Sequence, residues 1–354
     1  MMDNEVRDKK KAEEHTERNQ AVNQLKMLSV TAIFLIHCKF PGRAGEIIRG
    51  VASFGVPVFF MIAGFYSYRI SRSKIRKRAG HLFQLIVGAN LFYLVWDLAY
   101  LCLTGENVAV WTAENLNWKK LLIFLLFNET PLRGHLWFLG ALWYCYLLLL
   151  LFEATLSGRN QQGKEWYSRA GKVITAALLL GNLVLGEALT GLGHNLQIPY
   201  VRNWLFCGVP CFLAGYLIRE RQENQTARKM TRKRMIVLIA FCAVLGAVET
   251  CLIPDSELYL GTLLLALFSF MYVAYGNGEK KGCASWYLEF VDRNASLIYI
   301  LQVAVIKTLQ LILQRTGLGD NKVLAWIMPF AAFALTCLTA ELVTKIRVCI
   351  LHRK

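Results

Sequence analysis

The sequence has little charge for its length. Only 18% of its 354 residues are Asp, Glu, Lys or Arg and 55% are hydrophobic, whereas about 25% of a soluble domain is charged. Several apolar runs of about 20 residues contain one charge or none, and an α-helix needs that length to cross the hydrocarbon core of a bilayer. A very apolar soluble protein is excluded because its helices do not need such long runs. The sequence therefore predicts an all-α polytopic membrane protein.

The sequence also lacks Cys-x-x-Cys pairs, and we expect no cleavable leader. None of the ten cysteines forms a Cys-x-x-Cys pair, and most fall within apolar runs. We interpret them as small buried hydrophobic residues and expect no metal site. Residues 1–24 are too acidic for the first region of a signal peptide, and no small-residue cleavage site follows. We expect residues 1–24 to form a polar cytoplasmic tail and residues 25–350 to form one membrane domain.

About ten apolar segments are expected to cross the membrane. The first is short and ends at Pro41 and Gly42, a pair of residues that typically marks a turn. The run Trp118–Phe127 is apolar but has only about ten residues, so it predicts a re-entrant or surface helix. The ten segments are 25–40, 47–68, 82–103, 135–154, 172–190, 202–218, 235–253, 257–275, 294–313 and 324–348.

Lysine and arginine are unevenly distributed between alternate loops. Most of the 40 basic residues fall in the two terminal tails and in the loops at 69–78, 159–172, 219–234 and 280–293. Cytoplasmic loops of membrane proteins carry such an excess, so both termini are predicted to be cytoplasmic. The asymmetry also accounts for the net charge of +16 without a nucleic-acid partner. No internal repeat is visible, which argues against inverted-repeat transporter folds.

One histidine, His37, lies inside the first apolar segment. An ionisable side chain at membrane depth is costly unless it is used or paired. Lys26 lies eleven residues earlier, which on an α-helix is within about 20° of the same face and roughly 16 Å away. From these residues alone, His37 could be a buried hydrogen-bonded group or part of a proton relay. Asp97, in the outer half of the third segment, could face a water-filled cavity or pair with another helix.

Five motifs, in order, resemble the acyltransferase-3 family of bacterial integral-membrane acyltransferases. Lys26 and His37 are similar to the family's pattern of a basic residue, ten intervening residues and a histidine on its first helix. The likeness covers about residues 22–350 and the family's ten spans, as in its minimal, membrane-domain-only members. The other motifs are GVPVFFMIAGF at 55–65, HLWFLGALWYCYLLLL at 135–150, FCGVPCFLAGYLIRE at 206–220 and SLIYILQ at 296–302.

The sequence departs from the family pattern at three places. Lys26 stands where arginine is commoner, so a bidentate contact is lost. Gln302 replaces a histidine often found in the family, so this position is not expected to titrate. The cytoplasmic Arg-x-x-Arg motif after the second helix corresponds to Arg78-Ala-Gly-His81 or, alternatively, to Arg69-Ile-Ser-Arg72.

The resemblance implies an O-acyltransferase of the bacterial plasma membrane, with acetyl-CoA or another acyl-CoA as co-substrate and no permanently bound cofactor. An acyl group, usually acetyl, would move to a hydroxyl of an envelope glycan or lipid-linked sugar. His37 would act as general base or carry the acyl group transiently, and Lys26 would bind donor phosphate or orient the thioester. The residues implied to hold coenzyme A phosphates are Arg69, Arg72, Arg76, Arg78 and His81, and those implied to line the acceptor site are Asp97, His135 and Trp137.

Other interpretations stay open. The same interior could serve a permease or flippase-like transporter of a small hydrophilic solute, or the protein could be a scaffold for polysaccharide synthesis. The basic cluster after the second segment could have no role beyond setting the orientation of the protein in the membrane. His135 and Trp137 could be anchors at the membrane surface. The sequence specifies neither the acceptor, nor the acyl chain, nor the oligomeric state.

Overall fold

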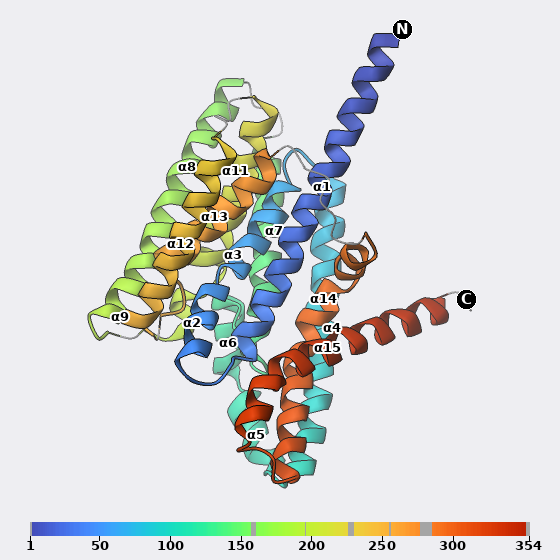
Figure 1. Ribbon diagram of the computed structural model, residues 1–354, viewed down its shortest axis with the longest axis vertical. Helices are drawn as coiled ribbons and strands as arrows, with labels where there is room; N and C mark the ends of the chain where they lie inside the picture. Colours follow the sequence, from blue (N-terminus) through green and yellow to red (C-terminus); the bar gives the residue numbers. More distant parts are fainter. Residues whose placement is uncertain are drawn as a thin grey trace. The chain divides into compact units, whose positions relative to one another are not determined.

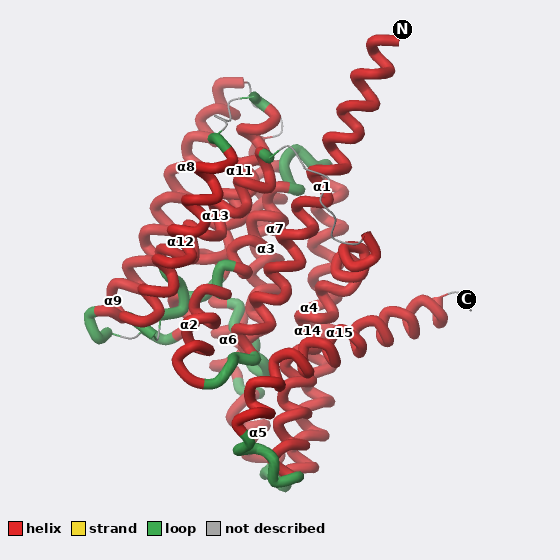
Figure 2. Tube along the Cα trace, viewed as in Figure 1, coloured by secondary structure: helices red, strands yellow, loops and turns green. Residues whose placement is uncertain are grey.

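The computed structural model describes residues 2–156, 161–194, 196–225, 230–254, 256–276 and 285–351. Throughout these ranges the regular structure is helical, with no strand (Figures 1 and 2). The chain divides into two compact units. Unit 1 comprises Met1–Phe59, Arg221–Pro254 and Tyr259–Lys354, and unit 2 comprises Phe60–Glu220 and Asp255–Leu258. The predicted all-α class is confirmed.

The two units are built from helices of very different lengths. In unit 1 they are α1 (Met2–His37), α2 (Gly42–Ala52), α12 (Arg232–Leu252), α13 (Leu260–Tyr275), α14 (Ser285–Arg315) and α15 (Lys322–Leu351). In unit 2 they are α4 (Arg72–Thr104), α5 (Val108–Asn115), α6 (Trp118–Phe127), η1 (Gly134–Leu136), α7 (Trp137–Leu156), α8 (Gln161–Leu183), η2 (Val184–Ala188), α9 (Leu189–Gly191), α10 (Ile198–Val201), η3 (Trp204–Gly208) and most of α11 (Val209–Glu223). Helix α3 (Gly55–Phe65) spans the division between the units.

Within the described ranges, eight helical segments are long and apolar enough to cross a membrane. Each matches one of the ten predicted segments. The other two predictions fall on the apolar end of α1 and on α13, which has 16 residues. The chain is therefore a multi-pass membrane protein, while the number ten and the side of the termini stay predictions. The eight segments are Gly42–Phe65, Arg72–Thr104, Gly134–Ala154, Ser168–Gly191, Ile198–Glu223, Arg232–Leu252, Arg293–Arg315 and Lys322–Ile350.

The predicted second segment, 47–68, is not one continuous helix. Helix α2 ends at Ala52 and α3 begins at Gly55. Ser53 between them donates a hydrogen bond from Oγ to Thr262 Oγ1 at 3.0 Å. Pro57 lies in the first turn of α3, where its missing N–H leaves no gap in the helix. Irregular backbone at membrane depth is tolerated only where protein or a water-filled cavity surrounds it, so this break marks an interior position.

In unit 1, α1 packs against α14 and α15 through two apolar clusters. The first contains Val30 of α1 with Ala295, Ile298 and Ala340. The second contains Phe34 and Cys38 with Ile306 and Ala332. Because residue numbers rise together on α1 and α14, these two helices run parallel through both clusters.

The interpretation of the cysteines as buried residues is correct for only part of the set. Cys102 and Cys349 are exposed, and Cys251 and Cys337 are partly exposed. Exposure on a helix that crosses a membrane means contact with lipid, so an apolar run does not by itself place a thiol in the protein core. The buried ones are Cys38, Cys145, Cys207, Cys211 and Cys242.

In unit 2, α3 and α11 approach so closely that only glycine fits at the contact. A Cβ added to Gly64 would overlap the carbonyl oxygen of Phe212, and one added to Gly215 would overlap the carbonyl oxygen of Met61. Small residues at such contacts let two membrane helices pack backbone against backbone. This packing positions the end of α3 and therefore the loop that follows it.

Replacing Gly215 by alanine should lower the thermal stability of the detergent-solubilised protein. Overpacking costs about 1–3 kcal/mol, which exceeds the roughly 1 kcal/mol by which alanine is favoured over glycine within a helix. Gly88→Ala on α4 is the matched control, because no atom lies within 4 Å of the added Cβ. Equal melting temperatures for the two variants would contradict the close contact.

Candidate functional site

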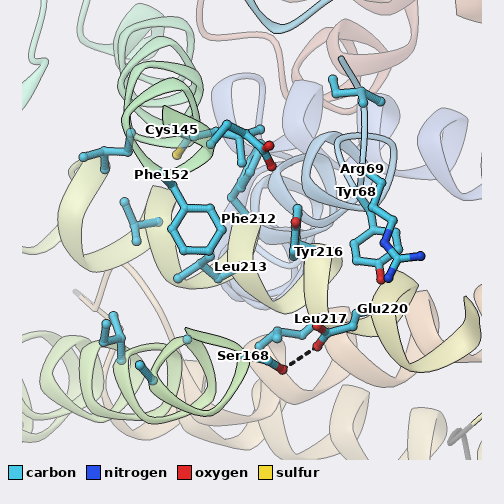
Figure 3. Close-up of a pocket in the computed structure, with 18 of the residues that line it drawn as sticks. Tyr68, Arg69, Cys145, Phe152, Ser168, Phe212, Leu213, Tyr216, Leu217 and Glu220 are labelled. Carbon is cyan, nitrogen blue, oxygen red and sulfur yellow. Dashed lines mark hydrogen bonds between the residues drawn. The ribbon is translucent and has the colours of Figure 1, made fainter. Parts of the chain in front are cut away.

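Unit 2 contains a cavity of about 1150 Å³ between α7, α8 and α11 (Figure 3). Pockets for drug-sized molecules occupy about 300–1,000 Å³, so a larger ligand fits here. Its lining runs along α7 from Cys145 to Ala154 and along α11 from Val209 to Glu220. These stretches are about 14–16 Å long at 1.5 Å per residue. Most of the wall is apolar, with Leu148, Leu149, Phe152, Ile174, Phe212, Leu213 and Leu217 among its residues.

The polar residues gather at one end of this cavity. Ser168 on α8 donates a hydrogen bond to Glu220 Oε2 at 2.7 Å. One turn before Glu220, the ring of Tyr216 lies 5.1 Å from that of Tyr68 in the loop between α3 and α4. Arg69 follows Tyr68, and its guanidinium lies 5.0 Å from the Tyr68 ring. Figure 3 shows Tyr68 and Arg69 on one side of the cavity and Cys145 on the other.

Two of the five residues implied to hold coenzyme A phosphates line the cavity. They are Arg69 and Arg72, and the carboxyl groups of Glu153 and Glu220 lie in the same wall. Each guanidinium offers planar, bidentate donors to an anion. The cavity therefore joins a charged end, with two guanidinium and two carboxyl groups, to an apolar space that continues away from it.

The other three basic residues lie elsewhere. Arg78 donates from Nη1 to the carbonyl oxygen of Tyr66 at 3.0 Å and to Ser67 Oγ at 3.2 Å. It therefore closes the end of α3 by satisfying a terminal carbonyl group. Arg76 and His81 are exposed on α4 and do not line the cavity. The structure thus favours the Arg69-Ile-Ser-Arg72 alternative as the part of this loop that faces a ligand space.

A second polar group in unit 2 surrounds Asp97 of α4. This residue is only 3% exposed, and its carboxylate pairs with the guanidinium of Arg133. Arg133 also lies 5.0 Å from the ring of Trp96 and 5.7 Å from that of Tyr93. The Tyr93 ring in turn packs edge-on against His135 at 5.3 Å. Asp97 and His135 are therefore linked through Arg133 and the Tyr93 ring, and their role in an acceptor site stays a prediction.

Trp137 belongs to a neighbouring charged group. Arg202 lies 5.6 Å from its ring, and Arg202 Nη1 pairs with Glu257 Oε2 at 3.0 Å. The space beside Gly134 lies between Arg202 and Glu129, because a Cβ built there would be 3.6 Å from Glu129 Oε1 and 4.0 Å from Arg202 Nη2. Burial raises the pKa of the Glu129 carboxyl above its ordinary value, and the Arg202 guanidinium only partly opposes this.

Asn128 holds the loop that carries these charged residues. Its backbone is left-handed, with φ 56°, and its side chain is fully buried. The amide donates to the carbonyl oxygen of Trp137 at 2.8 Å and accepts from the backbone N–H of Trp204 at 2.8 Å. One side chain therefore joins the end of α6 to the starts of α7 and η3.

Lys26 and His37 belong to unit 1. Both lie on α1, which is continuous from Met2 to its last residue, His37. The eleven-residue spacing on one helix therefore keeps the two side chains on nearly one face. Each is partly buried.

Sequence reasoning missed four charged residues of unit 2, namely Glu129, Arg133, Arg202 and Glu257. All lie in or beside connections between apolar segments, where charge is normally read as solvent exposure. One signal was present for the two arginines, because the outer loops are otherwise poor in basic residues. A lone arginine in such a loop is a candidate partner for a carboxylate inside a span.

Comparison with known proteins identifies one family. The acyltransferase-3 family model, described as an acyltransferase domain, matches residues 19–344. No curated protein and no solved structure matches the chain.

The raised pKa of Glu129 predicts a pH effect on stability. The folded protein binds this proton more tightly than the unfolded chain. Stability should therefore fall as the pH rises from about 4.3, the pKa of glutamate in the unfolded chain, through the raised pKa of the folded state. Glu129→Gln should remove this part of the fall, whereas Glu114→Gln, at an exposed position of α5, should leave it unchanged. Thermal unfolding across this range measures the difference, and identical curves for wild type and Glu129→Gln would contradict it.

Proposed function

This chain belongs to the acyltransferase-3 family and is a membrane acyltransferase, and from that premise we propose its substrates and residues. It takes an acyl group from a cytoplasmic coenzyme A thioester, and we propose acetyl as that group. It transfers this group to a hydroxyl of a glycan or lipid-linked sugar at the bacterial plasma membrane. The observation that carries the proposal is the cavity that joins Arg69 and Arg72 to an apolar space.

The cavity suits the two ends of a coenzyme A thioester. The nucleotide end bears phosphates, for which arginine is a strong bidentate partner. The thioester arm is less polar and would extend between the apolar side chains of α7 and α11. The predicted topology places the Arg69 and Arg72 end at the cytoplasmic surface, where acyl-CoA is present.

His37 has the chemistry for the transfer step. As general base it takes the proton of the acceptor hydroxyl while that oxygen attacks the thioester carbonyl carbon. The new C–O bond forms, the C–S bond breaks, and coenzyme A leaves with the proton returned to its sulfur. In the alternative route the imidazole carries the acyl group between donor and acceptor. Lys26, on the same face, would bind donor phosphate or orient the thioester.

The polar groups of unit 2 beside Asp97 and Trp137 suit the acceptor. Asp97, Arg133 and His135 offer hydrogen-bond donors and acceptors next to the rings of Tyr93 and Trp96. Hydroxyl groups of a sugar need both kinds of partner. These residues would hold the acceptor and select it.

The break between α2 and α3 favours a second candidate function. Transporters bind solutes at discontinuous membrane helices, so a permease for a small hydrophilic solute is the alternative. Radiolabel separates the two: movement of acyl label from coenzyme A to an envelope polymer supports the enzyme. Solute accumulation in proteoliposomes without acylation supports the permease.

His37→Ala should abolish acylation while the protein stays inserted and folded. Loss of a general base reduces the rate about 10²–10⁴-fold. The measurement is transfer of labelled acetyl from acetyl-CoA to envelope glycans in membranes, with size-exclusion profiles as the folding check. His194→Ala, at an exposed position before α10, is the control and should retain activity. Normal acylation by the His37 variant would remove His37 from the mechanism.

Arg72→Gln should raise the KM for acetyl-CoA about tenfold, equivalent to about 1.4 kcal/mol, with little change in kcat. Acetyl-pantetheine lacks the nucleotide phosphates, so its KM should be the same for wild type and variant. Lys172→Gln removes an exposed charge next to the cavity-lining Gly171 and should change neither KM. An equal effect of Arg72→Gln on both donors would exclude a phosphate contact.

A further inference from the structure

A small polar layer lies between the two apolar clusters of unit 1 along α14 and α15, and Phe333 beside it packs against both clusters. The layer contains Gln302 of α14, which is 1% exposed, and Thr336 of α15, which is fully buried. Gln302 lies four residues after Ile298 and four before Ile306, so all three project from one face of α14. Ile298 belongs to the cluster with Val30 and Ile306 to the cluster with Phe34. Gln302 therefore faces α1 at a level between those clusters.

The amide of Gln302 has an unused donor. Its Nε2 is buried and has no hydrogen-bond partner among the described residues. The Thr336 hydroxyl, in the same layer, is already engaged, because it donates to the carbonyl oxygen of Ala332 at 2.7 Å. A buried donor without a partner costs about 1–3 kcal/mol, whereas leucine or methionine would fill a similar volume without that cost. Packing alone therefore gives no reason for glutamine here.

Along the parallel helices α1 and α14, Gln302 lies beside the stretch of α1 between Lys26 and His37. Val30 lies four residues after Lys26 and seven before His37, so the three share one helix face. The cluster with Val30 lies before Gln302 along α14 and the cluster with Phe34 lies after it. The unused donor thus lies within about two helical turns of His37 along α1.

We propose that Gln302 is a catalytic residue of the acyl transfer, donating a hydrogen bond from Nε2 to the carbonyl oxygen of the acyl group beside His37. This inference rests on the proposed function. When the acceptor hydroxyl adds to the carbonyl carbon, its proton passes to His37 and negative charge develops on the carbonyl oxygen. The amide stabilises that charge until the C–S bond breaks and coenzyme A leaves. A fixed donor in a buried site is effective in this role, because it needs no reorganisation during the reaction.

Gln302→Met keeps the length of the side chain and removes the donor. We expect kcat for acetyl transfer to fall about 10²-fold, the effect of losing one such donor. The KM for acetyl-CoA and the midpoint of the pH–rate profile should stay unchanged, and the melting temperature should not fall. The matched control is Thr336→Val, which removes a polar group from the same layer and should keep kcat within about threefold. Gln302→Leu is the second variant if the Gln302→Met protein does not fold.

The outcomes separate the two proposals. Wild-type kcat in a folded Gln302→Met or Gln302→Leu protein, with His37→Ala inactive, would overturn the role of Gln302 and leave the proposed function standing. A shifted pH–rate midpoint would also overturn it, since the amide would then act through His37. A wild-type protein that transfers no acyl group would overturn both.

Discussion

A carboxylate inside an apolar helix has to be neutralised, and the pairing of Asp97 with Arg133 does this in unit 2. Breaking a buried pair by removing one partner costs about 3–5 kcal/mol. The pair therefore ties the chain before η1 to the last third of α4, 36 residues away. His135 and Trp137 follow within four residues of Arg133, so their positions depend on the same contact. Asn128 makes a second tie, from the end of α6 to the starts of α7 and η3.

The same rule explains why the remaining polar residues gather in a few places. In lipid each buried donor or acceptor needs a partner within the protein or in a ligand. Arg78 is satisfied by the end of α3, and Ser168 by Glu220. Arg69 and Arg72 instead line a cavity, and Gln302 keeps a donor unused. Among the described residues, buried atoms without a partner also occur at Glu129, Arg133, Asn182 and Arg202.

Most of the fold could be predicted from the sequence, because the length and period of an apolar run are local properties. The short helix Trp118–Phe127 has the predicted bounds, and eight predicted spans match helices of sufficient length. The division of the second span at Ser53 was not predictable. Ser53 at this division bonds to Thr262, more than 200 residues away, and Pro57 was the more obvious place for a kink.

The sequence by itself determined the all-helical membrane architecture, the shared face of Lys26 and His37, and the order of motifs that resemble the family. These depend on helix periodicity and on spacing within one segment. Only the tertiary structure decided which arginines of the loop after α3 face a cavity, which cation pairs with Asp97, and that the Gln302 donor is unused. Each of these depends on which distant side chain comes within hydrogen-bonding distance, and no local pattern encodes that distance.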